Sequence, residues 1–205
     1  MWKRGGPLLL ALLAPLPAAG DEEPSERESE YEMPASEAWA LPGFRVQLRF
    51  GRDSLVGGDG APDASGWSFT VEPGIRLSAS FSLSATLRYA ALVEGFEGVR
   101  YTTSGDATWH PFDGFFLAAG IGYAGLVGNS ALTGRCDGDG VVLLARTGWL
   151  IAAGELFATG PVIQLDQQWT GCGTEAWDWE EEEAIESSRT WSHRSLHFSW
   201  SLAWR

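Results

Sequence analysis

The feature that most constrains the fold is an alternation of large apolar residues with small or polar ones. In the last eleven residues, SLHFSWSLAWR, every second position is apolar: Leu196, Phe198, Trp200, Leu202 and Trp204. Side chains of a β-strand point alternately to opposite faces, so this period of two predicts a strand with one apolar face. In a soluble sheet that face meets the protein core, whereas in a membrane barrel it meets lipid.

The same alternation recurs in eight segments, without a helical pattern of comparable strength. These segments are residues 44–50, 67–77, 83–93, 99–109, 115–125, 140–150, 156–169 and a closing stretch from about 190. Strands of roughly ten residues are long enough to cross a bilayer at a tilt. The connections near 52–66, 94–98, 127–139 and 170–188 are mostly long, and those near 79, 112 and 153 are short. Long outer loops and short periplasmic turns are typical of outer-membrane barrels.

Charged and amide side chains occupy the polar face of these segments, often in mid-strand. They are Arg45, Arg49, Glu72, Arg76, Arg88, Arg100, Asp106, Arg146, Gln164 and Asp166. The interior of an eight-stranded barrel is just wide enough for side chains to fill, and enclosed charges must pair. We therefore expect a network of ion pairs that closes the lumen. The alternative is a narrow gated channel for ions or small solutes.

Aromatic residues lie near the ends of the segments, on the apolar side. They are Trp67, Tyr89, Tyr101, Trp109, Tyr123, Trp149, Trp169 and Trp204. Two such belts mark the membrane interfaces of transmembrane barrels, and a soluble barrel has no need of them. The pattern predicts an all-β protein whose residues 43–205 form an eight-stranded antiparallel up-and-down transmembrane β-barrel.

The first 42 residues differ from the rest in composition. Residues 1–20, MWKRGGPLLLALLAPLPAAG, have the basic start, apolar stretch and small-residue end of a secretory signal peptide cleaved near Gly20. Residues 21–42 follow as an acidic periplasmic segment, expected to be disordered. The formal net charge of the chain is -13, and it is concentrated in this segment and in residues 174–186. Such acidity argues against nucleic acid as a partner, because phosphates would be repelled.

With these features the chain resembles the small outer-membrane β-barrel proteins of Gram-negative bacteria, the outer-membrane-protein-A-like and opacity-like eight-stranded barrels. The resemblance covers residues 43–205. It rests on the signal peptide, the hairpins VEPGIRLSASFSLSATLRY and ATWHPFDGFFLAAGIGY, and the last strand with its aromatic end. It implies a monomer that lies in the cell outer membrane among its lipids. It also implies that the outer-membrane assembly machinery recognises the last strand as a targeting signal. Arg205 departs from the family, whose members usually stop on the aromatic residue.

The two cysteines are predicted to form a disulfide. Residues that face each other across an antiparallel hairpin lie equally far from its turn. A turn centred on Gly154 places Cys136 opposite Cys172, because each is eighteen residues away. Both are exported and lie just beyond the strands, so a disulfide between the third and fourth outer loops is expected. Two unpaired thiols are the alternative.

Catalysis is a rival class of function, because some eight-stranded outer-membrane barrels modify lipids with a serine and a histidine. Ser192 and His193 lie at the outer start of the last strand, followed by His197. A catalytic Ser–His pair needs a hydrogen bond and a third, orienting group, and adjacent strand residues point apart. We therefore expect no enzymatic activity, no cofactor and no metal centre, and His110 beside Pro111 is read as structural.

The acidic outer loop has two interpretations. Its notable residues are Glu175, Trp177, Asp178, Trp179, Glu180, Glu181, Glu182 and Glu183. It is either a solvated segment that keeps the surface anionic or a docking loop for an extracellular partner, since exposed aromatic residues suggest one. Its carboxylates could also bind divalent cations, which prefer oxygen ligands. The sequence thus predicts a non-enzymatic structural or surface-interaction protein.

Overall fold

The computed structural model describes residues 39, 41–58, 61–130, 134–178 and 183–205, and only the backbone of 130, 134, 173–178 and 183–189. The chain divides into two units, Met1–Glu32 and Met33–Arg205, and the described residues all belong to the second. The predicted signal peptide lies outside the described residues, as does the predicted acidic segment apart from Trp39, Leu41 and Pro42.

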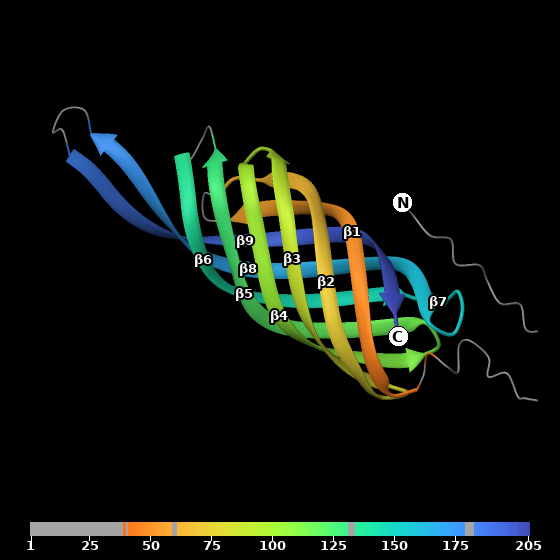
Figure 1. Cartoon of the computed structure of the whole chain (residues 1–205). Helices are drawn as coiled ribbons and strands as arrows, with labels where there is room; N and C mark the ends of the chain where they lie inside the picture. The colour runs from red at the N-terminus through yellow and green to blue at the C-terminus, as the bar shows by residue number, and fades with distance from the viewer. Residues whose placement is uncertain (1–38, 40, 59–60, 131–133, 179–182) are drawn as a thin grey trace, which may run out of the picture. The chain divides into compact units, whose positions relative to one another are not determined.

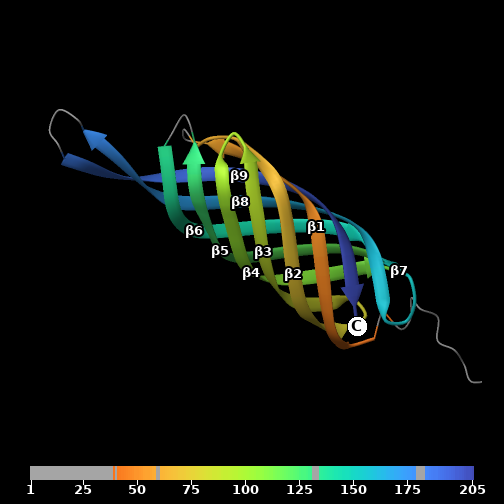
Figure 2. The same cartoon turned by 45° about the horizontal axis from the view of Figure 1, so that its top comes forward.

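Antiparallel strands make up nearly all of the second unit. They are β1 (Gly43–Gly58), β2 (Ala64–Ser78), β3 (Phe81–Glu94), β4 (Glu97–Phe112), β5 (Phe115–Ser130), β6 (Gly134–Trp149), β7 (Ile151–Ala152), β8 (Phe157–Asp178) and β9 (Glu183–Trp204). From β1 to β6 each strand pairs with the next, β8 pairs with β6, β7 and β9, and β9 pairs with β1, which closes the cylinder. β7 continues β6 beyond Leu150 and pairs with the same neighbour, β8. The result is a closed barrel of eight spans (Figures 1 and 2).

The barrel is polar inside and apolar outside. Leu87 leaves 55% of its surface exposed, whereas Arg88, the next residue, leaves 3%. The same alternation runs along every long strand, because successive side chains point to opposite faces. Among the described residues, most buried side chains on the strands are hydroxyls, amides, histidines and charges, and large apolar side chains cover the outer wall. No helix in the described part of the chain is both long and apolar enough to cross a membrane.

The two ends of the barrel differ. At one end, here the turn end, the short connections are residues 79–80, 113–114 and 153–156. At the other, the hairpin end, β8 and β9 stay paired with each other as far as Asp178 and Glu183. Pairing of β8 with β6 ends at Gly173, and pairing of β9 with β1 ends at Ser192. A two-stranded hairpin therefore extends past the neighbouring strands (Figure 1).

Much of what the alternation predicted as long loops at the hairpin end is strand instead. β1 continues to Gly58, β5 to Ser130, and only Gly95 and Phe96 separate β3 from β4. Gly95 has a φ of 76°, the left-handed conformation that glycine adopts without strain, which allows this tight turn. The strands are longer than predicted because pairing persists where alternation in hydropathy has faded.

The predicted register between β6 and β8 was wrong by two residues. Ile151 pairs with Thr159, and the Ala153 amide donates to the Phe157 carbonyl at 2.9 Å, so the turn is centred on Glu155 rather than Gly154. Leu156, expected to begin the strand, is exposed within the turn. Cys172 consequently pairs with Gly138 rather than with Cys136. The two cysteines nevertheless form a disulfide, with their Cα atoms 5.1 Å apart.

Candidate functional site

The lumen holds equal numbers of buried positive and negative charges. Among the described residues, the buried arginines and carboxylates on the inner face are Arg49, Arg88, Arg100, Arg146, Asp53, Glu72, Asp106 and Asp166. Ion pairs divide these four arginines and four carboxylates into two clusters of four, each formally neutral. Seven of the eight belong to the predicted network, and Asp53 is new.

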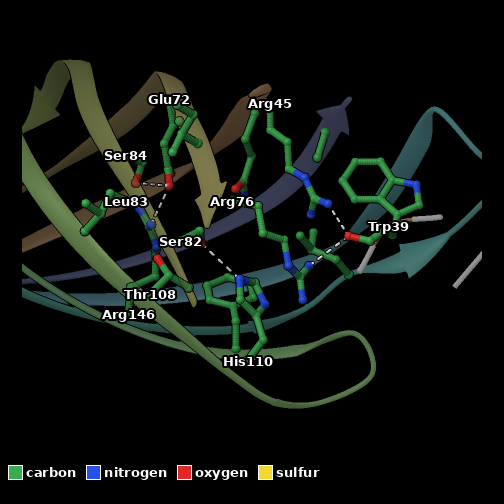
Figure 3. Close-up of a pocket in the computed structure, with 16 residues that line it drawn as sticks. Trp39, Arg45, Glu72, Arg76, Ser82, Leu83, Ser84, Thr108, His110 and Arg146 are labelled. Atoms are coloured by element: carbon green, nitrogen blue, oxygen red, sulfur yellow. Dashed lines mark hydrogen bonds and ion pairs between the residues drawn. The ribbon is translucent and has the colours of Figure 1, made fainter. Parts of the chain in front are cut away.

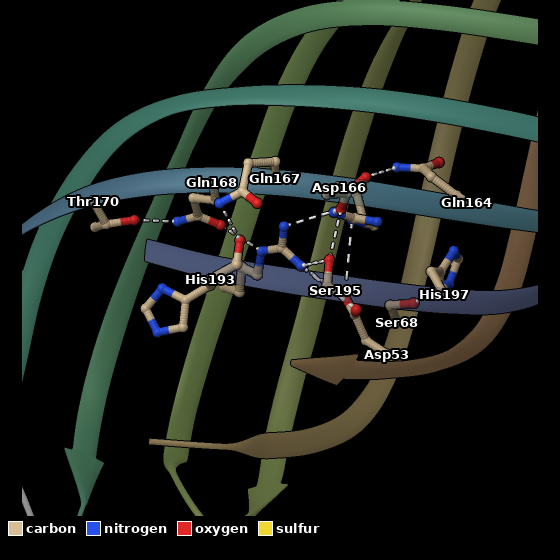
Figure 4. A network of polar contacts seen from close by, with 12 residues as sticks. Asp53, Ser68, Gln164, Asp166, Gln167, Gln168, Thr170, His193, Ser195 and His197 are labelled. Atoms are coloured by element: carbon tan, nitrogen blue, oxygen red, sulfur yellow. Dashed lines mark hydrogen bonds and ion pairs between the residues drawn. The ribbon is translucent and has the colours of Figure 1, made fainter. Parts of the chain in front are cut away.

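The hairpin-side cluster consists of Asp53, Arg88, Arg100 and Asp166. Arg100 contacts both carboxylates, at 3.3 Å from Asp53 and 3.0 Å from Asp166, and Arg88 forms an ion pair with Asp166 and a longer one of 4.0 Å with Asp53. Neutral groups complete it: Arg100 donates to Gln168 and to Ser195, both at 2.8 Å. Figure 4 shows Asp166 and Gln168 of β8 and Ser195 of β9 close to Asp53 of β1.

The turn-side cluster consists of Arg49, Glu72, Asp106 and Arg146. Glu72 pairs with Arg49 at 3.2 Å and with Arg146 at 2.6 Å, and Arg146 lies 3.7 Å from Asp106. Hydroxyls supply further donors, with Ser84 reaching Glu72 at 2.8 Å and Ser104 reaching Asp106 at 2.9 Å. Both clusters therefore combine opposite charges with hydrogen bonds, which is the condition for burying charge at tolerable free energy.

Gln164 connects the two clusters. Its Oε1 accepts a hydrogen bond of 2.8 Å from Arg49, and its Nε2 donates one of 2.7 Å to Asp166. The amide can do this because it carries both an acceptor and a donor. The charged lumen is thus one connected network across β1, β2, β3, β4, β6 and β8.

Apolar side chains close the hairpin end above this network. Leu55, Leu92, Phe96, Leu126 and Trp191 are buried there in one hydrophobic cluster, together with Ala64 and the two disulfide cysteines. The disulfide thus lies inside the barrel wall, within this plug. Trp191 connects this plug to the polar interior through an aromatic contact with His193, whose ring centroid lies 5.9 Å from that of Trp191.

Trp39 closes the turn end. Its side chain is 7% exposed, and its indole donates a 3.1 Å hydrogen bond to the Gly154 carbonyl. The guanidinium of Arg45 lies 4.7 Å from the ring centroid, and Arg45 and Arg76 both donate to the Trp39 carbonyl (Figure 3). Arg45 and Arg76 were predicted as lumen charges. The structure places them at this end, half-buried and apart from the two clusters.

Two histidines of β9 also face the lumen. His197 Nε2 lies 2.5 Å from Ser68 Oγ, at hydrogen-bond distance, whereas His197 Nδ1 has no hydrogen-bond partner among the described residues. Neither ring nitrogen of His193 has one there either. Ser192 lies on the other face of the strand, where it accepts a hydrogen bond from Gln167 at 2.9 Å. The structure therefore separates Ser192 from His193 and instead pairs Ser68 with His197.

The aromatic residues predicted as girdles all point outward and are exposed. Trp109, Trp149 and Trp204 lie toward the turn end, where two of them meet phenylalanines: Trp149 contacts Phe112 and Phe115, and Trp204 contacts Phe157. The other five, Trp67, Tyr89, Tyr101, Tyr123 and Trp169, lie toward the hairpin end, with Tyr89 and Tyr101 at directly opposed positions of β3 and β4. An apolar wall lies between the two groups.

The predicted docking residues of the acidic loop fall only partly within the described residues. Residues 179–182, which include Trp179 and three of the glutamates, lie outside them. The backbone of the flanking residues belongs to the protruding hairpin, where Trp177 pairs with Ala184 and Asp178 with Glu183. The side chains of these flanking residues are likewise outside the described part of the chain.

Comparisons with known proteins bear on the fold. No protein-family model matches the chain, and no curated protein matches its sequence. Among solved structures, Neisserial surface protein A superposes with a TM-score of 0.57 at 12% identity, over 78% of this chain and 96% of that one. The outer membrane protein OprG from Pseudomonas aeruginosa (TM-score 0.46, 8% identity, 81% and 98% covered) is also similar. So is the N-terminal β-barrel domain of OprF from the same organism (TM-score 0.37, 18% identity, 78% and 99% covered). The likeness to Neisserial surface protein A confirms the predicted fold: the chain is all-β, a closed eight-stranded antiparallel barrel similar to that surface protein.

Proposed function

We propose that this chain is a non-enzymatic outer-membrane β-barrel that acts as a structural or surface-interaction protein. In this proposal the turn end faces the periplasm, and the hairpin end presents its acidic hairpin outside. The observation that carries the proposal is the closure of the lumen along its length. An apolar plug, two ion-pair clusters and Trp39 follow one another from the hairpin end to the turn end.

The outer wall supports a position in a membrane. Large apolar side chains exposed over the whole circumference are unfavourable in water, and a contiguous patch of this size marks contact with lipid or another apolar partner. The two groups of outward aromatic residues fit the interfacial belts of such barrels. On this basis lipid is the main partner, and the last strand, with Trp204 facing outward, is the segment that the assembly machinery would read.

Refolding tests the membrane position. The purified chain should fold only in detergent or lipid, migrate differently on gels before and after heating, and give a β-type circular dichroism spectrum in micelles. A folded monomer that stays soluble without detergent would contradict the proposal.

Conductance across a planar bilayer tests the closed lumen. The wild-type protein should insert without producing stable unit steps, because two buried ion-pair clusters occupy the lumen. Stable steps that Arg88→Ala or Asp106→Ala alters would instead identify a narrow gated channel. A variant of the exposed Arg194, Arg194→Ala, is the control, since its side chain lies outside the lumen.

The Ser68–His197 pair does not suggest a hydrolase. Both side chains are buried, and the histidine nitrogen that an orienting acid would contact has no partner among the described residues. We therefore propose that expression leaves the lipid A of the host unchanged. Mass spectrometry of lipid A from cells with and without the protein is the measurement. A modified species that disappears in both His193→Ala and His197→Ala variants would establish the enzymatic alternative.

A further inference from the structure

A cavity lies inside the barrel between the turn-side cluster and Trp39. It has a volume of about 60 Å³, and its polar lining includes Arg45, Gln47, Arg76, His110 and Arg146 (Figure 3). A single water needs roughly 10–15 Å³ of such volume, so there is room for several waters or for one small ion. A larger cavity on the far side of Trp39, Arg45, Arg76 and His110 shares these residues as lining and leads to the turn end.

Hydrogen-bond donors that face this cavity lack acceptors among the described residues. Arg45 Nε, Gln47 Nε2 and Arg146 Nε are buried without a hydrogen-bond partner there, and Arg146 Nη1 has only its 3.7 Å ion pair with Asp106. Arg146 is itself only 3% exposed. The carboxylate at the cavity, Glu72, is already engaged by Arg49, Arg146 and Ser84. Buried donors without acceptors are unfavourable, so the site favours a guest that brings oxygen acceptors.

The charge of the lining favours an anion. Glu72 and Arg146 belong to the neutral turn-side cluster, which leaves Arg45 and Arg76 as added positive charges. Within the described residues, neither forms an ion pair with a carboxylate, and their hydrogen bonds go to the backbone carbonyls of Trp39, Leu41, Ser78 and Ala79. Asp113 acts on Arg76 only from a distance, and Arg205 adds a further positive charge near Arg45.

We propose that this cavity is a binding site for a small oxyanion, such as inorganic phosphate, sulfate or a short carboxylate, that enters from the turn end. Arg45 and Arg76 supply the charge, and Gln47 and Arg146 supply the donors. The barrel wall separates the cavity from lipid, so the guest is a free ion rather than a lipid headgroup. This site is independent of whether the hairpin end binds a partner, and it requires no passage through the lumen.

Calorimetric titration of the full-length protein in zwitterionic micelles tests the proposal, with inorganic phosphate, sulfate and acetate at constant ionic strength. The wild type should bind at least one of them saturably. The double variant Arg45→Gln/Arg76→Gln should bind about tenfold more weakly, the effect of losing charge-assisted hydrogen bonds. Arg52→Gln/Arg194→Gln is the matched control, since both arginines are exposed on the outer wall, and it should bind like the wild type.

A second variant keeps the test decisive if the double variant fails to fold. Gln47→Leu removes one unpartnered donor and leaves Arg45, Arg76 and Trp39 in place, so it should fold with unchanged heat-modifiability and weaken binding several-fold. Equal loss of binding in the Arg52/Arg194 control would show that the anions only screen surface charge. No saturable binding of any of the three anions to the wild type would overturn the proposal.

Discussion

At the scale of single residues, stability depends on how completely each buried charge is matched. Asp166 Oδ2 accepts hydrogen bonds from Arg88, from Arg100 at 3.0 Å and from Ser195 at 3.0 Å, while its Oδ1 accepts from Gln164. Removing its charge leaves Arg88 and Arg100 facing Asp53 alone. Loss of one partner from a buried ion pair is strongly destabilising, because the other charge stays buried without compensation.

We therefore predict that Asp166→Asn lowers the free energy of unfolding by about 3 kcal/mol. Urea unfolding in micelles is the measurement. Adding Arg88→Gln restores the neutrality of the cluster, so the double variant should lose less than the sum of the two single variants. Glu94→Gln is the control, because its pair with Arg52 is exposed to solvent and should contribute little to stability. Additive losses in the double variant would argue against a coupled cluster.

The sequence identified most charges of the network but not all of its polar partners. Asp53 was missed because it follows Arg52 in a stretch predicted to be a loop. It lies an even number of residues from Arg45 and Arg49 on the same strand and therefore points to the same face. Trp39 falls in the segment 21–42, whose low hydrophobicity and two prolines, Pro24 and Pro34, predict disorder. Which donor meets which acceptor depends on which strands face each other across the closed barrel. The alternation of side chains along a single strand does not determine this.

At the scale of elements, the alternation predicted the spans well and their ends poorly. Between the aromatic belts one face is apolar and the other polar, so hydropathy shows each strand. Toward the hairpin end the inner face carries the buried apolar side chains of the plug, so the two faces no longer differ in polarity, and the period of two fades although pairing continues. The register error at the β7–β8 connection has a similar origin: apolar Leu156 looks like the start of a strand, and one misplaced turn shifts every later pair.

The protruding hairpin contains like charges at opposed positions. Glu175 pairs with Glu186, and Asp178 with Glu183, while Ser188 pairs with uncharged Gly173. Like charges directly opposite each other destabilise a sheet, and opposite charges stabilise it by about 0.2–1 kcal/mol. We predict that Glu186→Lys slows amide hydrogen exchange in residues 174–187 and that Ser188→Lys, on the same face, has a smaller effect. Equal effects would mean that net charge, rather than the opposed pair, controls the hairpin.

The disulfide should restrain this hairpin more than it stabilises the barrel. Cys136 and Cys172 close a segment whose strands are already paired below them, and Cys172 lies two residues before Thr174, where the hairpin leaves β6. Because most of that segment is ordered without the crosslink, the entropic gain expected for its length is reduced. We predict that Cys172→Ser leaves heat-modifiability intact and increases protease cleavage within 174–186. Failure of the variant to assemble, or labelling of both cysteines as free thiols in the wild type, would contradict this.

At the scale of the whole molecule, the distribution of polarity is inverted relative to a soluble protein. Among the described residues, four buried arginines match four buried carboxylates in charge, and most of the large apolar side chains face outward. The sequence predicted this inversion because the inversion depends only on two features: the alternation of polar and apolar residues along each strand, and the positions of the aromatic residues near the strand ends. The closed barrel is the outcome of eight spans of similar length. An outward apolar wall of this kind is expected to meet lipid, and substitutions on it can test that contact.

Two arginine substitutions provide that test. Ile163 is outward, 41% exposed, and midway along β8 between Phe157 and Trp169 of the two aromatic groups, whereas outward Val127 lies four residues beyond Tyr123 toward the hairpin end. If lipid covers the wall, Ile163→Arg should lower the free energy of unfolding in phospholipid vesicles by about 2–4 kcal/mol, and Val127→Arg by about 0–1 kcal/mol. If water covered it, both substitutions would replace an exposed apolar side chain with a soluble one and differ little. Equal losses of unfolding free energy in the two variants would therefore contradict a position of the barrel in the membrane.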